Sequence, residues 1–418
     1  MADRIEAGAA DSADASPVFY QGVTKRYGDA AEPAVEALTL DVEAGEICVL
    51  VGPSGCGKTT ALRMANRTVE MTEGDIRIGD RSVRERSPSE LRREIGYVIQ
   101  QIGLFPHRTV ADNVATVPRL LGWDRERISS RVDELMALIG LEPELRDRYP
   151  GQLSGGQQQR IGVARALAAN PRVMLMDEPF GAIDPINRER LQNEFLRLQR
   201  EIRKTVLFVT HDIDEAIKMG DRIAVMRKGG RLAQYATPAE LLMSPTNDFV
   251  EDFVGADRAL KRLSLMRVAD IDLWTAPLAF VGQATNEVRA KIGGAEVPHA
   301  LLVDSERHPL GWLSEQDLRK QTVPERPDSS PDPILELEDV MRDALADIMQ
   351  SETQYAPVVD GEGRVAGVLS VEIIQDFLAS PAAFVEEHGA AERPLAEEER
   401  ESAPTVTGER PRDYPPGD

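Results

Sequence analysis

The sequence predicts two kinds of domain, a larger α/β domain with a parallel sheet and a smaller α+β module made of two similar units. Three observations support this prediction. The apolar run "EICVLVG" ends in the glycine-rich loop "GPSGCGKTT", and "TTALRMANR" follows it with helical spacing. Two further apolar runs, "PRVMLMDEP" and "TVLFVTHD", read as strands of the same sheet. Later in the chain, "HALLVDSERHPLGWLSEQDL" and "YAPVVDGEGRVAGVLSVEII" repeat one order of strand, turn, strand and helix start.

The length and the N-terminal segment limit what the chain can be. At 418 residues it can hold two or three domains, and no run of about 18 apolar residues suggests a membrane span. Residues 1–17 lack an apolar core, so we predict a short disordered lead and not a secretory signal. Cys48 and Cys56 have no metal-ligand spacing and little prospect of a disulfide, which fits a reducing cytosol.

The charge of the chain argues against one class of partner. The net charge is -22, and residues 261–418 contribute 31 acidic but only 15 basic side chains. Nucleic acids are bound by basic faces, so we expect no nucleic acid partner. Residues 381–418 combine acidic side chains with proline and glycine, which predicts an acidic disordered tail that acts as a solubilising extension.

The loop after the first apolar strand predicts a nucleotide site. It fits the pattern G-x-x-x-x-G-K-[ST] in the strand, loop and helix context that this motif requires. Backbone N–H groups and the helix N-terminus would face the phosphates. We expect Lys58 to contact the terminal phosphates and Thr59 to offer its hydroxyl to Mg²⁺. The predicted phosphate-binding residues are Gly52, Pro53, Ser54, Gly55, Cys56, Gly57, Lys58, Thr59 and Thr60.

Two other strands end in residues that suit catalysis. Asp177 ends the strand in "VMLMDEP" and is placed to hold Mg²⁺, while Glu178 beside it can accept a proton from an attacking water. The alternative for this pair is a solvated acidic turn, which the phosphate loop upstream disfavours. His211 follows the strand in "TVLFVTHD", at the sheet edge where parallel sheets bind ligands. The alternative there is a histidine satisfied in the core or on the surface.

The stretch "LSGGQQQR" places a serine and two glycines at a predicted helix start, which is a second anion-binding N-terminus. One nucleotide does not need two such loops, so we interpret the second as serving another molecule. With it, "GPSGCGKTT", "VMLMDEP", "GAIDP" and "FVTHD" resemble, in order and separation, the ATP-binding subunit of an ABC transporter over about Val18 to Val250. The resemblance implies a P-loop NTPase cassette with a RecA-like core and a helical subdomain at about 101–170.

In that family two subunits dimerise head to tail, and each ATP lies between the phosphate loop of one subunit and the signature of the other. Here the signature is Ser154, Gly155, Gly156 and Gln157. The resemblance also implies that Tyr27 stacks on adenine and that Asp184 contacts the dimer interface. Gln100 in "YVIQQ" matches a glutamine that approaches the metal or the attacking water, with Gln101 as the one-residue alternative.

Two longer stretches, "YVIQQIGLFPHRTVADNVATVPRLLGW" and "MDEPFGAIDPINRERLQNEFLRLQ", resemble the ATPases of bacterial importers for glycine betaine, carnitine, choline or proline. This implies a homodimer at the cytoplasmic face of the membrane, an integral permease and an extracytoplasmic substrate-binding protein. The segment "IGLFPHRTV" would face the permease, or else belong to the core. The alternatives are an ABC ATPase of another small-molecule importer, a soluble non-transport ABC ATPase, or a nucleotide sensor without turnover.

The repeated units resemble paired CBS domains, at about 258–320 and 335–380 within residues 255–380, after an ATP-binding domain at 18–254. Ser314 and Asp317 match a CBS pattern that contacts ribose, whereas Ser370 is followed by Ile373. Candidate ligands of the pair are an anionic lipid or a cyclic dinucleotide. A basic cluster at the entrance to this region suggests salt-dependent lipid contact, with pairing to nearby acids as the alternative; it comprises Arg258, Lys261, Arg262 and Arg267.

Overall fold

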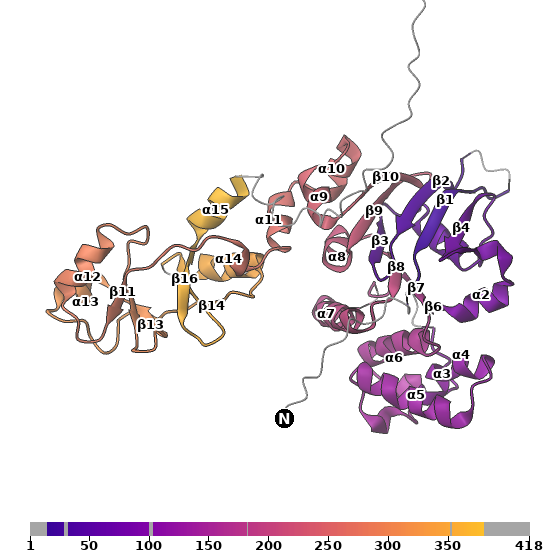
Figure 1. Ribbon diagram of the computed structural model, residues 1–418, viewed down its shortest axis with the longest axis horizontal. Helices are drawn as coiled ribbons and strands as arrows, with labels where there is room; N and C mark the ends of the chain where they lie inside the picture. Colours follow the sequence, from indigo (N-terminus) through magenta and orange to yellow (C-terminus); the bar gives the residue numbers. More distant parts are fainter. Residues whose placement is uncertain (1–14, 29–31, 100–102, 182, 352, 380–418) are drawn as a thin grey trace, which may run out of the picture.

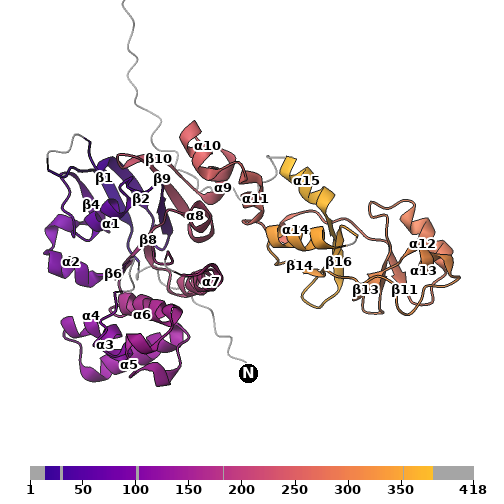
Figure 2. The same cartoon turned by 180° about the vertical axis from the view of Figure 1, so that it is seen from behind.

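The computed structural model describes residues 15–28, 32–99, 103–181, 183–351 and 353–379. Figure 1 shows a larger N-terminal domain and a smaller C-terminal domain that extends to one side of it. The same separation is visible from behind in Figure 2. A short helix, α11 (Arg258–Leu263), lies where the two domains meet.

A mainly parallel sheet forms the centre of the N-terminal domain. In the described part of the chain its order is β10-β9-β3-β8-β7-β6, with only β10 antiparallel to its neighbour. Strands β3, β7 and β8 are adjacent and buried along their whole length, so their carboxyl ends meet at one edge. The strands are β3 (Ile47–Val51), β6 (Ile95–Val98), β7 (Val173–Asp177), β8 (Thr205–Val209), β9 (Arg222–Arg227) and β10 (Arg231–Ala236).

A second, antiparallel sheet packs beside the first, in the order β2-β1-β4-β5. Helix α1 (Lys58–Ala65) lies between the two sheets, and the Tyr20 hydroxyl of β1 donates to the Ala61 carbonyl of α1 at 3.2 Å. The sheet therefore fixes the helix that follows the phosphate loop. Its elements are β1 (Val18–Lys25), β2 (Val35–Val42), β4 (Glu73–Ile78), β5 (Arg81–Ser82), a 3₁₀ turn (Val83–Glu85) and α2 (Pro88–Glu94).

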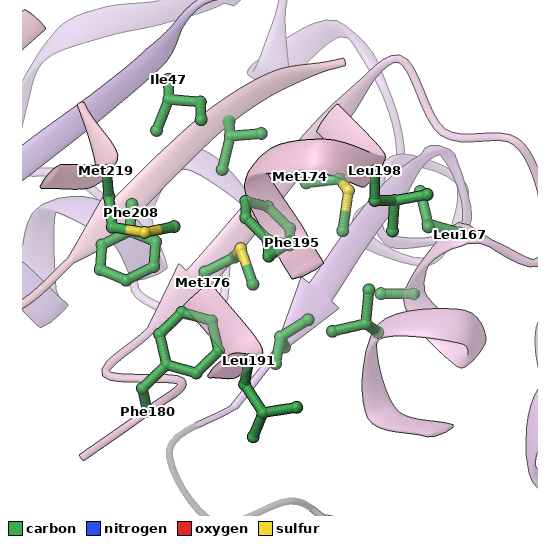
Figure 3. Packing of buried hydrophobic residues seen from close by; sticks show 14 of the residues in the cluster. Ile47, Leu167, Met174, Met176, Phe180, Leu191, Phe195, Leu198, Phe208 and Met219 are labelled. Atoms are coloured by element: carbon green, nitrogen blue, oxygen red, sulfur yellow. The ribbon is translucent and has the colours of Figure 1, made fainter. Parts of the chain in front are cut away.

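A group of helices lies at one end of the parallel sheet (Figure 1). Its members are α3 (Val110–Val114), α4 (Thr116–Leu120), α5 (Arg125–Leu138), 3₁₀ turns at Pro143–Leu145 and Pro150–Gln152, and α6 (Gly155–Leu167). They share one apolar core with the sheet and with α7 (Pro185–Ile202). Figure 3 shows Phe195 of α7 between Met174 and Met176 of β7, and the Phe180 ring lies 6.5 Å from that of Phe195 and 6.0 Å from that of Phe208 on β8. The helices α8 (Ile213–Met219), α9 (Pro238–Met243) and α10 (Asp248–Val254) complete the domain.

The C-terminal domain contains two units with the same topology. Each has a strand, a helix, an antiparallel strand pair and a second helix, and the first strand pairs in parallel with the second. The first unit comprises β11 (Leu278–Phe280), α12 (Thr285–Ile292), β12 (Leu301–Val303), β13 (Pro309–Trp312) and α13 (Glu315–Arg319). The second comprises β14 (Leu335–Glu336), α14 (Met341–Gln350), β15 (Tyr355–Val359), β16 (Val365–Ser370) and α15 (Val371–Ala379). A 3₁₀ turn at Val268–Asp270 precedes the first unit.

The two units are joined at His308, in the turn between β12 and β13. Its Nδ1 lies 2.9 Å from Asp304 Oδ2, and its Nε2 lies 3.0 Å from the carbonyl oxygen of Glu362 in the other unit. Both partners accept hydrogen bonds, so only the protonated imidazolium satisfies both at once. The Asp304 carboxylate and the Glu362 carbonyl accordingly raise the pKa of His308.

This joint predicts a pH dependence of stability. Because the folded-state pKa of His308 lies above its ordinary value of about 6.5, the stabilisation is fully present below that value and is lost as the pH rises through the folded-state pKa. We expect the Tm of the full chain to fall more between about pH 6 and pH 8.5 than that of His308→Gln. Calorimetry at matched salt measures this, and parallel pH profiles would contradict it.

The four side chains of the basic cluster at the domain junction all make contacts within the chain, whereas their predicted contact with anionic lipid stays a prediction. Arg258 pairs with Glu251 at 2.9 Å, and Lys261 pairs with Asp257 at 3.0 Å. Arg262 donates to the Leu378 carbonyl at 3.4 Å, and Arg267 donates to the Glu338 carbonyl at 2.8 Å. The alternative reading, pairing with nearby acids, is thus observed for Arg258 and Lys261.

Candidate active site

The phosphate loop begins where β3 ends and continues into α1. Gly57 caps α1 with a φ of 107°, a left-handed conformation that favours glycine. A Cβ at Gly57 would lie 2.3 Å from the carbonyl oxygen of Ala34, so the residue just before β2 also requires glycine there. The loop is therefore held in shape by its own backbone conformation and by its neighbours.

Lys58 lies inside this loop. Its side chain is buried, and its ammonium donates to the carbonyl oxygens of Gly52 at 2.7 Å and Pro53 at 3.1 Å. These bonds hold the positive charge at the centre of the loop, where a phosphate would meet it. Cys56 is also buried, and burial raises the pKa of its thiol, so this cysteine is a packing residue and not a nucleophile.

Asp177 and Thr59 meet although they come from different elements. The Thr59 hydroxyl donates to Asp177 Oδ1 at 2.9 Å, and the Asp177 carboxylate is only 2% exposed. A hydroxyl and a carboxylate are hard oxygen donors of the kind that Mg²⁺ prefers. The residues thus fit a magnesium ion that takes its remaining ligands from phosphate and water.

Sequence reasoning missed two other partners of Asp177. Arg63 lies one helical turn after Thr59, and its guanidinium is 3.5 Å from Asp177 Oδ2. Tyr97, on the neighbouring strand β6, lies beside both Asp177 and Arg63, and burial, followed by the nearby Asp177 carboxylate, raises its pKa. The spacing of four residues between Thr59 and Arg63 was the signal available for the arginine.

Glu178 and His211 form the second pair at this edge. His211 Nδ1 lies 3.3 Å from Glu178 Oε1, and the His211 side chain is 58% exposed. Glu178 has a φ of 44°, and its N–H donates to the Val209 carbonyl at 3.0 Å, so the chain turns sharply directly after the strand pair. A non-glycine residue in this conformation is strained, which is common where a side chain must be aimed at a reaction centre.

The signature begins helix α6. Ser154 Oγ accepts from the Gln157 N–H at 3.3 Å, and Gln157 Oε1 accepts from the Ser154 N–H at 2.9 Å, which forms a capping box. Ser154 and Gly155 are exposed, and among the described residues no hydrogen bond joins the signature to the phosphate loop. Figure 2 shows α1 beside β1 and β4, whereas α6 lies with the other helices of its group.

A buried glutamine links the helix that begins with the signature to the sheet edge where Glu178 lies. Gln159 Nε2 donates to the carbonyl oxygen of Pro179 at 2.6 Å, one residue after Glu178. Sequence reasoning did not single out Gln159, because a glutamine in "GGQQQR" gives no sign of which side chain points inward. A movement of α6 would therefore be transmitted through Gln159 to the loop that carries Glu178.

The remaining predicted site residues include Tyr27, Asp184 and Gln100. Tyr27 is 48% exposed, and the Lys25 ammonium lies 4.9 Å from its ring centre, so part of the ring is accessible to a stacking partner. Asp184 caps α7 and accepts from the Asn187 N–H at 3.1 Å. Gln100 and its alternative Gln101 lie outside the described residues.

Asp317 in the first C-terminal unit is fully buried and engaged within its own unit. It accepts from the Ser314 hydroxyl at 3.0 Å, from the Asp328 N–H at 3.2 Å and from Lys320 Nζ at 2.7 Å. Burial opposes its ionisation, but these donors lower its pKa. The carboxylate that was expected to meet a ribose is thus already satisfied in this conformation.

Comparison with known proteins identifies the family. The family model for the ABC transporter matches residues 35–181, and that for the CBS domain matches residues 329–380. The osmoprotectant import ATP-binding protein OsmV of Salmonella typhimurium is 47% identical over 350 residues, 83% of this chain and 91% of the relative. The chain belongs to the ATP-binding subunits of ABC transporters. It is an ATPase of the transport-coupled class, as the sequence predicted.

Other relatives agree over most of the cassette and the CBS region. The carnitine transport ATP-binding protein OpuCA of Listeria monocytogenes is 44% identical over 86% of this chain and 92% of its own length. The solved structure of cbiO1 from Clostridium perfringens, part of an ABC transporter complex, matches 59% of this chain and 94% of its own at 25% identity and a TM-score of 0.52. The predicted P-loop cassette fold is confirmed, and the CBS assignment is confirmed for the second unit, which lies within the matched residues 329–380. Among the described helices, none is both long and apolar enough to cross a bilayer.

Proposed function

We propose that two copies of this chain form the ATP-hydrolysing pair of an importer for a quaternary-amine osmoprotectant such as glycine betaine, carnitine or choline. The observation that carries this proposal is similarity along both the cassette and the CBS region. A glycine betaine/carnitine/choline transport ATP-binding protein of Bacillus subtilis is 42% identical over 85% of this chain and 96% of its own length. In the proposal the C-terminal domain regulates the cassette.

The arrangement of the two glycine-rich loops supports a composite site. Lys58 is held inside the phosphate loop, whereas the capped and exposed N-terminus of α6 offers Ser154 and the following N–H groups to another molecule. A helix N-terminus of this kind binds anions. A head-to-tail dimer would bring the signature of one subunit to the γ-phosphate held by the other, with Asp184 near the interface and Tyr27 on the adenine.

The catalytic edge supports direct attack of water on ATP. Thr59 and Asp177 would hold Mg²⁺, which withdraws charge from the phosphate oxygens; Gln100 is the third candidate at the metal. Glu178 would accept the water proton as the water oxygen bonds to the γ-phosphorus and the bond to the bridging oxygen of ADP breaks. His211, which contacts Glu178, would orient that carboxylate and hydrogen-bond the transferred phosphoryl group.

Exposed apolar side chains support a membrane partner. Phe105 is 37% exposed, and the guanidinium groups of Arg108 and Arg165 lie 4.7 and 5.9 Å from its ring centre. Other exposed apolar side chains are Leu120, Leu121 and Tyr149 of the helical subdomain and Ile99, which follows β6. Such a surface fits an integral permease. The chain would then lie peripherally at the cytoplasmic face, and an extracytoplasmic substrate-binding protein would deliver substrate to the permease.

Uptake measurements test the substrate class. The full-length chain, assembled with the permease and binding protein of its transport system, is reconstituted in liposomes that contain ATP and Mg²⁺. We expect uptake of at least one labelled quaternary amine, and none with Lys58→Ala, which removes the charge at the centre of the phosphate loop. ATP-driven uptake of a polyamine with no quaternary-amine uptake would reject the proposal in favour of another small-molecule importer.

A further inference from the structure

Lys261 occupies an unusual position at the junction between the domains. Its side chain is only 12% exposed, and its ammonium donates to the carbonyl oxygen of Val254 at 2.7 Å. It also lies 3.0 Å from Asp257 Oδ1 and 3.4 Å from Asp214 Oδ1. A Cβ on Gly255, where φ is 95°, would lie 3.5 Å from the ammonium and 2.8 Å from Asp257 Oδ1. The chain therefore places a nearly buried charge at the point where α8, α10 and α11 meet.

Helix α11 faces both domains. On one side Lys261 reaches α10 and α8 of the cassette. On the other side Leu263 packs in the core of the second CBS unit, and Arg262 donates to the Leu378 carbonyl of α15. Arg262 also approaches the sulfur of Met243 on α9, at 3.2 Å. A displacement of the second CBS unit therefore acts on α11, and through Lys261 on α8.

Helix α8 begins directly after the catalytic histidine of the proposed mechanism. Asp212 caps α8 and accepts from the N–H groups of Asp214 and Glu215, at 2.9 and 3.3 Å. The Asp212 N–H in turn donates to the Thr210 hydroxyl at 3.0 Å. His211 thus lies between two residues whose positions depend on the first turn of α8, and Lys261 binds the Asp214 side chain of that same turn.

We propose that Lys261 is a positioning residue for ATP hydrolysis. It couples the position of the first turn of α8, and with it that of His211, to the position of the second CBS unit. The inference rests on the proposed function, since it assigns His211 its role beside Glu178. Lys261 itself contacts neither nucleotide loop nor Glu178. Its effect is therefore expected on the chemical step and not on ATP binding.

Steady-state ATP hydrolysis by the full-length chain assembled with its permease tests this proposal. Lys261→Met keeps the aliphatic stem but removes the charge, and we expect kcat to fall about 5- to 10-fold with KM for ATP changed less than about twofold. Asp214→Asn removes the partner and should reproduce the loss. Because both act through one contact, the double variant should be no slower than the slower single variant. Lys261→Arg should restore most of kcat.

Arg258→Met is the matched control. It removes a positive charge from the same helix, but Arg258 pairs with Glu251 of α10 and is expected to leave kcat unchanged. The Asp214 side chain is 68% exposed, so Asp214→Asn decides the matter if Lys261→Met does not fold. A kcat within twofold of the parent for Asp214→Asn, or a changed KM with an unchanged kcat, overturns the inference. Turnover by Glu178→Gln would instead reject the proposed catalytic role of Glu178.

Discussion

Replacement of Glu178 by glutamine is expected to lower ATP turnover at least about 100-fold while ATP binding is retained, because the amide cannot accept the water proton. The lysine at the centre of the phosphate loop and the Thr59–Asp177 pair remain in place. Glutamine has nearly the same shape, so the turn at Glu178 and its contact with His211 are preserved. The variant should therefore accumulate with ATP bound and form a stable dimer.

Phosphate release measures turnover in this experiment, and a fluorescent ATP analogue measures binding. Glu189→Gln is the matched control, because Glu189 is an exposed carboxylate of α7 whose ion pair among the described residues is with Lys218, at 3.3 Å. The control should retain the parent activity. Turnover of Glu178→Gln within a few-fold of the parent would show that another group accepts the proton.

Replacement of Ser154 by arginine is expected to abolish ATP-driven dimerisation while each monomer still binds ATP. Arginine adds bulk at the exposed start of α6, where the partner's γ-phosphate is proposed to dock. The phosphate loop of the same subunit is not hydrogen-bonded to this serine and should be unaffected. In the Glu178→Gln background the parent signature should give a dimer with ATP on gel filtration, and the Ser154→Arg signature should give a monomer.

Ser87→Arg provides a control with the same local chemistry. Ser87 is an exposed serine that caps α2 through a capping box with Glu90, as Ser154 does with Gln157. The control therefore has the same lost cap, which costs about 1 kcal/mol, and the same added arginine, but at a helix outside the proposed interface. It should dimerise normally. Loss of ATP binding by the Ser154→Arg monomer would mean that both glycine-rich loops serve one site.

Local patterns in the sequence determined the elements that carry the chemistry. A continuous apolar run followed by glycine, lysine and threonine predicts a buried strand, a phosphate loop and a helix, since all of these depend on neighbouring residues. The same holds for Asp177, Glu178 and His211, because parallel strands end at one edge of their sheet. The capping box at Ser154 and Gln157 spans only three residues, so it too follows from local order.

Contacts between distant segments were decided by the tertiary structure alone. The partners of Asp177 include Tyr97 from another strand, and Gln159 reaches Pro179 across the helical subdomain boundary. The clearest case is the basic cluster, whose composition suggested a surface for anionic lipid. Folding packs Lys261 against Val254 and Asp214, because Leu263 fixes α11 in the apolar core of the second CBS unit while α10 and α8 bring those oxygen atoms to the ammonium. A charge in a sequence has no fixed environment; the elements that pack around it determine whether it meets solvent or a partner.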